Sequence, residues 1–401
     1  MDKCDFLVIG GGIIGFCIAR ELKKRHPNSR ILIIEKEDGF GLHASGRNSG
    51  VLHAGFYYTA DSFKAKFTQK GNQRLTQYCE SRSIPVNKCG KLVVAKNESE
   101  LVQLDELMAR AQANGVPIES ITEKEAKVIE PRVKTFKRAL FSPTTSSVNP
   151  SLVIQSMRED ALKEGISLIP KVRYLKKINE KTIQTSSGKI EFSFMVNSAG
   201  LYADKIAQDF GFSKDYRILP FKGLYIYSDE PMGSLRTNIY PVPDLRNPFL
   251  GVHFTVTADK KVKIGPTAIP AFWREQYKGV SNFKLDELFE IMFLQAGLFW
   301  SSDFDFKSLA IEELQKYSRK KLVSLASLLV KGIEQKSFNH WGVPGIRAQL
   351  LNIRNRKLEM DFVTEGDAHS LHILNAVSPA FTCSLPFADF ICDKISDLSG
   401  L

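Results

Sequence analysis

The chain has 401 residues, of which 43% are hydrophobic and 25% charged. These values are ordinary for a globular protein and exclude a disordered or collagen-like chain. The length predicts two interleaved domains. Lys and Arg number 55 against 44 Asp and Glu, a net charge of +11. This charge favours anionic partners in general but does not by itself indicate nucleic acid, and we expect no nucleic-acid binding.

The cysteines are scattered without a CxxC pair, at Cys4, Cys17, Cys79, Cys89, Cys383 and Cys392. We expect reduced thiols, and we expect no metal site because neither the cysteines nor the seven histidines have ligand spacing. The first residues lack the pattern of a signal peptide, and no uninterrupted apolar run reaches about 18 residues. The sequence therefore predicts a cytoplasmic protein, with peripheral attachment to the inner face of a membrane as the alternative.

A strand, a glycine-rich turn, a helix and a second strand follow one another at the start of the chain. The apolar run Phe6–Ile9 enters the glycine-rich stretch 10–15, Phe16–Lys24 has a helical pattern, and Ile31–Ile34 is a buried strand. Glu35 ends that strand 20 residues after the last glycine, the spacing of an acid that reaches a ribose hydroxyl. These features together predict a dinucleotide-binding βαβ unit.

Each residue type in this unit has a physical role. Gly10 permits the tight turn, Gly12 lets backbone N–H groups approach a pyrophosphate, and Gly15 allows the helix to pack closely on the strand. Glu35 would repel a 2′-phosphate, which favours FAD or NAD over NADP. At this point both FAD and NAD remain open.

The rest of the chain is predicted to alternate helices and short strands. Strands are expected at 91–94, 167–169, 182–185, 190–192, 194–197, 224–227, 249–256, 262–264 and 371–374, and helices at 99–114, 152–164, 285–300 and 320–331. The strands after Phe221 are rich in aromatic residues and indicate an antiparallel sheet. The last two helices before residue 332 carry more apolar side chains than usual, so they either pack on that sheet or form a membrane or partner surface.

The predicted fold class is α/β, a Rossmann-like FAD-binding domain interleaved with an α+β substrate domain on a mostly antiparallel sheet. A nucleotide domain that begins at residue 5 and is completed near the end of the chain must be discontinuous. We expect the FAD-binding domain at 1–80, 149–218 and 345–401, and the substrate domain at 81–148 and 219–344.

Several segments resemble one family closely. They lie at 48–58 (NSGVLHAGFYY), 89–94 (CGKLVV), 199–204 (AGLYAD), 239–243 (IYPVP), 248–254 (PFLGVHF), 345–349 (GIRAQ) and 375–380 (NAVSPA). With them the chain resembles, over essentially its whole length, the L-2-hydroxyglutarate oxidases and dehydrogenases of the D-amino-acid-oxidase-like FAD superfamily. It departs from their pattern at 44–47, 147–149, 222–224 and 267.

The resemblance implies a flavoprotein that oxidises L-2-hydroxyglutarate to 2-oxoglutarate by hydride transfer to FAD. The electron acceptor, oxygen or a quinone, stays open, as do covalent FAD attachment and the oligomeric state. The partner is a small dicarboxylate, with a peripheral membrane or quinone contact as a further expectation. The alternatives are an amino-acid, sarcosine or glycine oxidase of the same superfamily, or a non-catalytic, membrane-associated flavin-binding partner.

The reaction needs a base for the hydroxyl proton, and His53 is the first candidate because an ordinary histidine pKa near 6.5 suits neutral pH. His253 is the second candidate. A dicarboxylate also needs cationic or hydroxyl ligands, because a buried anion without a partner costs several kcal/mol. We expect Arg347 to bind a carboxylate as a fork and Lys222, where relatives carry Arg, as a point charge. Tyr57 and Tyr240, together with the adjacent Tyr58, would supply hydroxyl donors.

The resemblance also implies the residues that hold FAD. We expect them to be Gly10, Gly12, Gly15, Glu35, Ser45, Asn48, Val172, Ala199, Gly200, Ser378, Pro379, Ala380 and Thr382. Val172 would offer backbone groups to the adenine, and the helix that begins after Pro379 would direct its positive end toward the flavin.

Overall fold

The computed structural model describes residues 2–244, 249–301 and 306–400, so Pro248 of the family-like segment 248–254 lies outside the described residues. The chain separates into two units. The first contains Met1–Asn48, Pro150–Pro220 and Arg347–Leu401, and the second contains Ser49–Asn149 and Phe221–Ile346. Three of the predicted boundaries lie within two residues of these, whereas the first segment of the first unit ends at Asn48 and not at residue 80.

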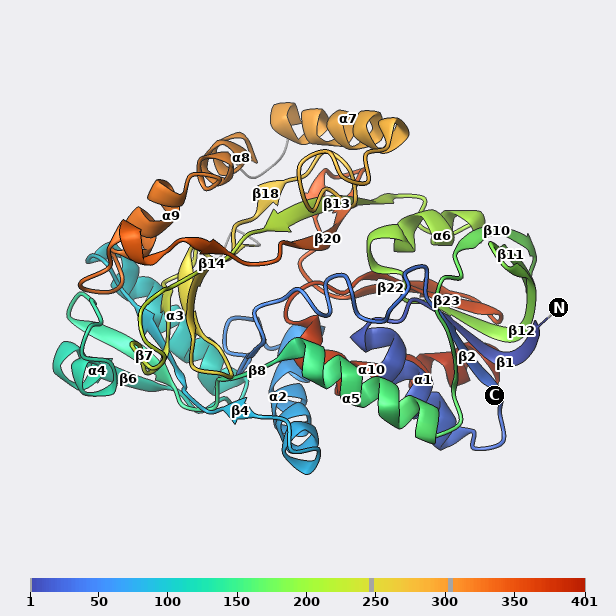
Figure 1. Ribbon diagram of the computed structural model, residues 1–401, viewed down its shortest axis with the longest axis horizontal. Coiled ribbons are helices and arrows are strands. Elements are labelled where there is room, and N and C mark those ends of the chain that lie inside the picture. The colour runs from blue at the N-terminus through green and yellow to red at the C-terminus, as the bar shows by residue number, and fades with distance from the viewer. Residues whose placement is uncertain (1, 245–248, 302–305, 401) are drawn as a thin grey trace. The chain divides into compact units, whose positions relative to one another are not determined.

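The first unit is built on a sheet with a parallel centre (Figure 1). Its strands are β1 (Asp2–Ile9), β2 (Ile31–Ile34), β9 (Ser167–Ile169), β10 (Tyr174–Asn179), β11 (Thr182–Thr185), β12 (Gly188–Asn197), β22 (Val363–Gly366) and β23 (Ser370–Asn375). β1 pairs in parallel with β12 and β2, β2 with β9, and β12 with β23. The antiparallel pairs are β10–β11, β11–β12 and β22–β23. The predicted α/β class with a Rossmann-like domain is therefore confirmed.

Helices pack on the sheet of the first unit. They are α1 (Ile13–Arg25), α5 (Pro150–Lys163), α6 (Ala203–Asp209) after the short 3-10 turn η1 (Gly200–Tyr202), and α10 (Ala380–Ser399). α1 contacts α5 and α10, whereas α6 contacts β10, β12 and β23. Leu7 and Ile9 of β1 share a core cluster with Ile206 of α6, so β1 is an interior strand that packs against helical residues.

The second unit contains an eight-stranded sheet of order β19-β14-β17-β16-β15-β5-β7-β6. Its strands are β5 (Lys91–Val94), β6 (Glu119–Thr122), β7 (Arg138–Ser142), β14 (Ile226–Tyr227), β15 (Asn238–Pro241), β16 (His253–Val256), β17 (Val262–Gly265) and β19 (His340–Trp341). β5 and β15 pair in parallel, and the other neighbours pair antiparallel. A small sheet joins β3 (Val51–Leu52), β4 (Val86–Asn87) and β8 (Ser146–Val148).

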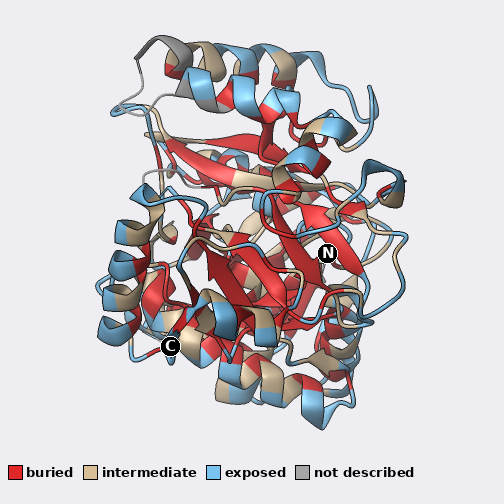
Figure 2. Ribbon diagram, turned by 90° about the vertical axis from the view of Figure 1, so that its left-hand side faces the viewer, coloured by how far each residue is buried: buried red, intermediate tan, exposed pale blue. Residues whose placement is uncertain are grey.

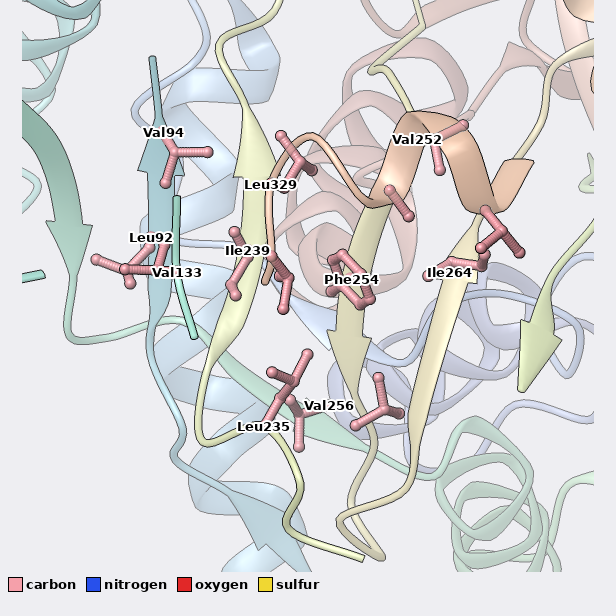
Figure 3. Packing of buried hydrophobic residues seen from close by; sticks show 14 of the residues in the cluster. Leu92, Val94, Val133, Leu235, Ile239, Val252, Phe254, Val256, Ile264 and Leu329 are labelled. Carbon is pink, nitrogen blue, oxygen red and sulfur yellow. The ribbon is translucent and has the colours of Figure 1, made fainter. Parts of the chain in front are cut away.

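The alternation of side chains gives the eight-stranded sheet two different faces. One face is apolar, and Figure 3 shows Leu92, Ile239, Phe254 and Ile264 side by side on four neighbouring strands. Successive residues of a strand point to opposite sides. The residues next to these four, among them Lys91, Tyr240, His253 and Lys263, therefore point to the other face.

The remaining elements of the second unit are mostly helices. They are α2 (Phe63–Ser81), α3 (Ser99–Ala113), α4 (Glu123–Ile129), α7 (Leu285–Ser301), α8 (Phe306–Gln315), α9 (Arg319–Ala326) and the 3-10 turn η2 (Gln335–Ser337), with the short strand β18 (Ile269–Pro270). Figure 2 shows that the strands are largely buried, whereas the helices also carry intermediate and exposed residues. α7 has strongly exposed Phe289 and Phe293. Within the described residues no helix combines the length and apolarity that crossing a membrane requires.

Two strands contain the boundary between the units. β13 (Tyr216–Gly223) and β20 (Gly345–Asn352) each have residues in both, and β13 pairs with β18 at Phe221 and Lys222. β20 pairs with the short strand β21 (Lys357–Leu358).

Several expected elements differ from those found. The predicted strands 190–192 and 194–197 are one strand, β12, because the register with β1 does not shift across the exposed Ser193. The predicted strand 249–256 begins only at His253, and the predicted helix 320–331 ends at Ala326. The sequence pattern did not indicate α8 at all.

Candidate active site

The glycine-rich turn in the first unit has the close approaches that its sequence predicts. Gly10 has φ +108°, and a Cβ there would lie 2.6 Å from the carbonyl oxygen of Ser198. A Cβ on Gly15 would lie 2.1 Å from the carbonyl oxygen of Gly10. No side chain larger than hydrogen fits at Gly15 unless α1 moves away from β1.

The start of α1 is bound by two polar side chains. The backbone N–H of Ile13 donates to Ser45 Oγ at 3.0 Å, and the N–H of Gly11 donates to Glu35 Oε2 at 2.8 Å. Glu35 also accepts from the N–H of Glu37 at 3.0 Å, so its buried carboxylate is held at the end of β2. Gly12 caps α1 without a side-chain hydrogen bond. A helix start that lacks a capping side chain, with small residues around it, fits the pyrophosphate of a dinucleotide.

The other residues expected at FAD lie in the first unit as well. Asn48 Nδ2 donates to the carbonyls of Ala44 and Ser45 at 3.2 and 2.7 Å. The N–H of Val172 donates to the carbonyl of Glu35 at 2.9 Å, so this N–H is already used. Ala199 and Gly200 follow β12, and Ser378, Pro379, Ala380 and Thr382 lie at the start of α10. Their contacts with FAD stay predictions.

Polar side chains gather on one face of the eight-stranded sheet. Tyr240 of β15 stacks on His253 of β16, with ring centroids 3.7 Å apart and planes at 18°. Thr255 of β16 pairs with Lys263 of β17, and Asn238 of β15 pairs with Lys91 of β5. All these side chains are buried. The second unit therefore has a polar sheet face, which we define by Lys91, Tyr240, His253, Thr255 and Lys263.

His53 is placed near this face by the loop that follows β3. Asn72 of α2 holds the loop, because its Nδ2 donates to the carbonyls of Leu52 at 2.9 Å and His53 at 3.2 Å. Burial, together with the charges of Lys91 and His253, lowers the pKa of His53 to about 3. The expectation of a histidine with an ordinary pKa is therefore wrong for the protein without substrate. The imidazole is therefore neutral at pH 7, and it is a weak base until a negative charge binds nearby.

Lys91 lies in a cage of aromatic rings. Its Nζ is 4.5 Å from the ring centroid of Phe56, 4.4 Å from that of Tyr57 and 4.9 Å from that of Tyr240. No hydrogen-bond acceptor among the described residues reaches this Nζ. Burial is the cause that lowers the pKa of Lys91 to about 7.

Lys263 is the second buried lysine on the polar sheet face. Its Nζ lies 4.5 Å from the ring centroid of Tyr225 and 5.6 Å from that of Tyr227. Burial lowers the pKa of Lys263 to about 8, and the charge of Asp259 opposes this shift. Lys263 thus has an acidic group nearby that partly compensates its charge.

The predicted carboxylate ligands lie on β13 and β20. Lys222 is on β13 and not on the eight-stranded sheet, and its Nζ is 5.8 Å from the ring centroid of Tyr317. Arg347 belongs to the first unit, on β20, and is half-buried. Burial raises the pKa of Tyr57 and of Tyr240, so both phenols stay protonated and act as donors. The structure thus brings together His53, His253, Tyr57 and Tyr240 in the second unit, whereas the roles of Lys222 and Arg347 stay predictions.

The sequence analysis missed Lys91 and Lys263 as candidates. Lys91 was noted only as part of a family-like segment, and Lys263 only as part of a strand. A signal was present in both, because each is a charged residue inside an otherwise apolar strand, KLVV and VKIG. Lysine is seldom fully buried, so a lysine inside an apolar strand is a candidate functional residue.

Comparison with known proteins identifies the family. Residues 5–302 match the family described as FAD dependent oxidoreductase (DAO). The computed structure is similar to that of L-alpha-glycerophosphate oxidase from Mycoplasma pneumoniae, with a TM-score of 0.77, 20% sequence identity and coverage of 100% of this chain and 96% of the other. At that identity the likeness concerns the fold. The chain belongs to the family of FAD-dependent oxidoreductases, so FAD as the predicted cofactor is confirmed.

Within this family the chain is similar to L-2-hydroxyglutarate dehydrogenases. It is 36% identical to the mitochondrial L-2-hydroxyglutarate dehydrogenase of Caenorhabditis briggsae, over 98% of this chain and 93% of the relative. It is 35% identical to the L-2-hydroxyglutarate dehydrogenase of Indibacter alkaliphilus, over 96% and 97%. The resemblance predicted from the sequence is therefore confirmed.

Proposed function

We propose that this protein oxidises L-2-hydroxyglutarate to 2-oxoglutarate with FAD as the oxidant. The observation that carries the proposal is the near full-length match to relatives named L-2-hydroxyglutarate dehydrogenase, in both an animal and a bacterium. The polar sheet face supports it independently. Together with His53 and Tyr57 it offers a neutral histidine, two phenols that can donate and buried lysines, the groups that bind and deprotonate an anionic alcohol.

The reaction removes two hydrogens from the substrate, one from the α-carbon and one from the hydroxyl group. FAD, when bound, supplies a two-electron acceptor for the hydrogen on the α-carbon. His53 takes the hydroxyl proton on its ring nitrogen as the carbon–oxygen double bond forms, and His253 is the second candidate for this step. The low pKa of His53 keeps the ring deprotonated at neutral pH, and the charge of a bound dianion raises that pKa during the reaction.

Other parts of the predicted site stay predictions. Lys222 and Arg347 are expected to bind substrate carboxylates, and Tyr57 and Tyr240 to donate hydrogen bonds to the substrate. The cytoplasmic location, the peripheral contact with a membrane and the use of oxygen or a quinone as electron acceptor are likewise predictions from the sequence.

Anaerobic flavin reduction tests the proposal. The purified holoprotein is mixed without oxygen with L-2-hydroxyglutarate, D-2-hydroxyglutarate, L-malate, glycerol 3-phosphate, sarcosine or glycine, and the flavin absorbance is followed. We expect rapid bleaching with L-2-hydroxyglutarate alone. Bleaching by sarcosine or glycine, with release of an amine or ammonia, would instead establish an amino-acid oxidase. No bleaching by any of the six would leave a flavin-binding partner as the better reading and would refute the proposal.

A further inference from the structure

We propose that Lys91 is the electrostatic switch of the site: its buried amine takes up a proton when the anionic substrate binds, and the resulting ammonium attracts the substrate from beneath the rings of Tyr57 and Tyr240. This inference rests on the proposed function, because it assigns to Lys91 the task of selecting anionic substrates. Lys91 acts through the groups above it and is therefore a positioning residue.

The surroundings of Lys91 are unusual for a structural lysine. A buried ammonium is normally paired with a carboxylate, since an isolated buried charge costs several kcal/mol. Three ring faces lie within 4.9 Å of Nζ, while no acceptor among the described residues reaches it. Ring faces attract a cation but do not neutralise it. When the Lys91 amine is protonated, the described residues around it therefore supply no counter-ion for its charge.

The position of Lys91 links this charge to the candidate base. The charge of Lys91 contributes to the low pKa of His53, so the two groups are within electrostatic reach of each other. Tyr240, which contacts Lys91, also stacks on His253. An anion that binds beside His53 thus interacts with Lys91 across a medium of low dielectric constant. Such an interaction between unit charges is on the order of 10- to 100-fold in affinity at separations of about 7–10 Å.

Lys263, on the same polar sheet face, has a pKa lowered to about 8 and is tested below by its own variant. The titratable groups that face Lys91 more closely are less suited to respond between pH 7 and 9. Burial keeps His53 neutral over this range and keeps Tyr57 and Tyr240 protonated. Cys89, next to Asn238 on the neighbouring strand, also has its pKa raised by burial. Lys91 has its pKa near 7. His253 is separated from Lys91 in the experiment below by the use of a Lys91 variant.

The direction of the pH effect follows from linkage. An anion stabilises the protonated form of Lys91, so its pKa rises in the complex. Affinity is full below pH 7, where Lys91 already carries its proton. It falls above pH 7, by up to tenfold per pH unit, and levels off once the pH exceeds the raised pKa of the complex. Above the pKa of the complex, Lys91 is neutral both with and without substrate.

The test measures the half-saturating concentration of L-2-hydroxyglutarate for anaerobic flavin reduction from pH 6 to 9. For the unchanged holoprotein we expect a flat region below pH 7 and a 10- to 100-fold rise above it. For Lys91→Met, whose side chain is uncharged and of similar length, the half-saturating concentration should not change with pH. It should be 10- to 100-fold above that of the unchanged protein at pH 6 and equal to it near pH 9. Lys263→Met is the matched control, because Lys263 is buried on the same face but has Asp259 nearby, and it should keep the rise above pH 7.

The outcomes separate the two proposals. If the unchanged protein is reduced by L-2-hydroxyglutarate but its half-saturating concentration does not change between pH 7 and 9, the role of Lys91 is refuted without any variant. A Lys91→Met protein that retains FAD and still shows the rise refutes it as well. If L-2-hydroxyglutarate does not reduce the unchanged protein at any pH, the proposed function fails, and the switch fails with it.

Discussion

The ring of Tyr240 on β15 lies flat against the ring of His253 on β16, with centroids 3.7 Å apart. The two residues are neighbours across an antiparallel pair, because Ile239 faces Phe254 in the register. His253 Nδ1 is 2.8 Å from the carbonyl oxygen of Gly251, which fixes the tautomer with a proton on Nδ1 when the ring is neutral. The stack and this hydrogen bond together hold the imidazole in one orientation.

Tyr240→Phe keeps the stack and removes only the hydroxyl. If this hydroxyl donates to the substrate, kcat/KM for L-2-hydroxyglutarate should fall by about tenfold, the value of one hydrogen bond of about 1.4 kcal/mol. For Tyr240→Leu, which also removes the ring contact, kcat/KM should fall further. Steady-state kinetics measures both. Tyr174→Phe is the control, because that phenol donates to Asp209 in the first unit; unchanged kinetics for Tyr240→Phe would remove Tyr240 from the site.

His53→Asn should lower the rate of anaerobic flavin reduction by about 10²- to 10⁴-fold, the usual contribution of a general base, while FAD stays bound. Since the pKa of His53 is lowered to about 3, the base is already deprotonated at mildly acidic pH. We therefore expect kcat/KM of the unchanged protein to show no loss between pH 7 and 5. The exposed His340, which pairs with Asp229, provides the control His340→Asn. An acid limb near pH 6.5 that His253→Asn abolishes would make His253 the base.

Gly15→Ala should abolish FAD binding or folding, because its Cβ would lie 2.1 Å from the carbonyl oxygen of Gly10. The ratio of flavin to protein absorbance after gel filtration measures the effect. Gly297→Ala is the matched control: it is the same substitution inside α7, where, apart from the helix's own backbone, no heavy atom of the described residues lies within 4 Å of the new Cβ. This control should be neutral or stabilise the protein by up to about 1 kcal/mol. Full FAD content in Gly15→Ala would contradict the packing described for α1 and β1.

Lys91→Met should raise the melting temperature at pH 6. The folded pKa of Lys91 is about 7, below the value of about 10.4 in an unfolded chain. The unfolded state therefore binds more protons between these values, so this lysine opposes folding below pH 7 and the penalty disappears toward pH 10. Removing it should stabilise the protein by on the order of 4–5 kcal/mol at pH 6 and by little at pH 10. Calorimetry at both pH values measures this, and a variant less stable at pH 6 would show that the ring contacts outweigh the burial cost.

Local sequence signals were sufficient for much of the first unit. β2, β9 and β11 occur at the predicted residues, because short apolar runs there are bounded by turn residues. The glycine contacts at Gly10 and Gly15 also follow from their spacing alone, because the turn between a strand and a helix admits few backbone conformations.

The candidate active site depends on contacts between segments that are far apart in the sequence. Sequence patterns did not reveal these contacts. Lys91 is buried by rings from residues 56, 57 and 240, and its neighbour on the sheet is 147 residues away, at Asn238. The low pKa of His53 likewise arises from burial and from charges on β5 and β16. A prediction from residue type alone therefore assigned His53 an ordinary pKa and overlooked Lys91.

The parallel pairing of β5 with β15 has a consequence for biosynthesis. This ladder joins residues 91–94 to 238–241, and the apolar cluster on one side of the sheet draws Leu92 and Ile121 from the early segment and Phe254 and Ile264 from the late one. A nascent chain that has emerged only as far as residue 150 has an unpaired β5 edge and half of a core. The second unit cannot complete its sheet until about another hundred residues have been synthesised. During that interval the exposed strand edge and apolar residues make the chain a substrate for chaperones that bind extended apolar segments.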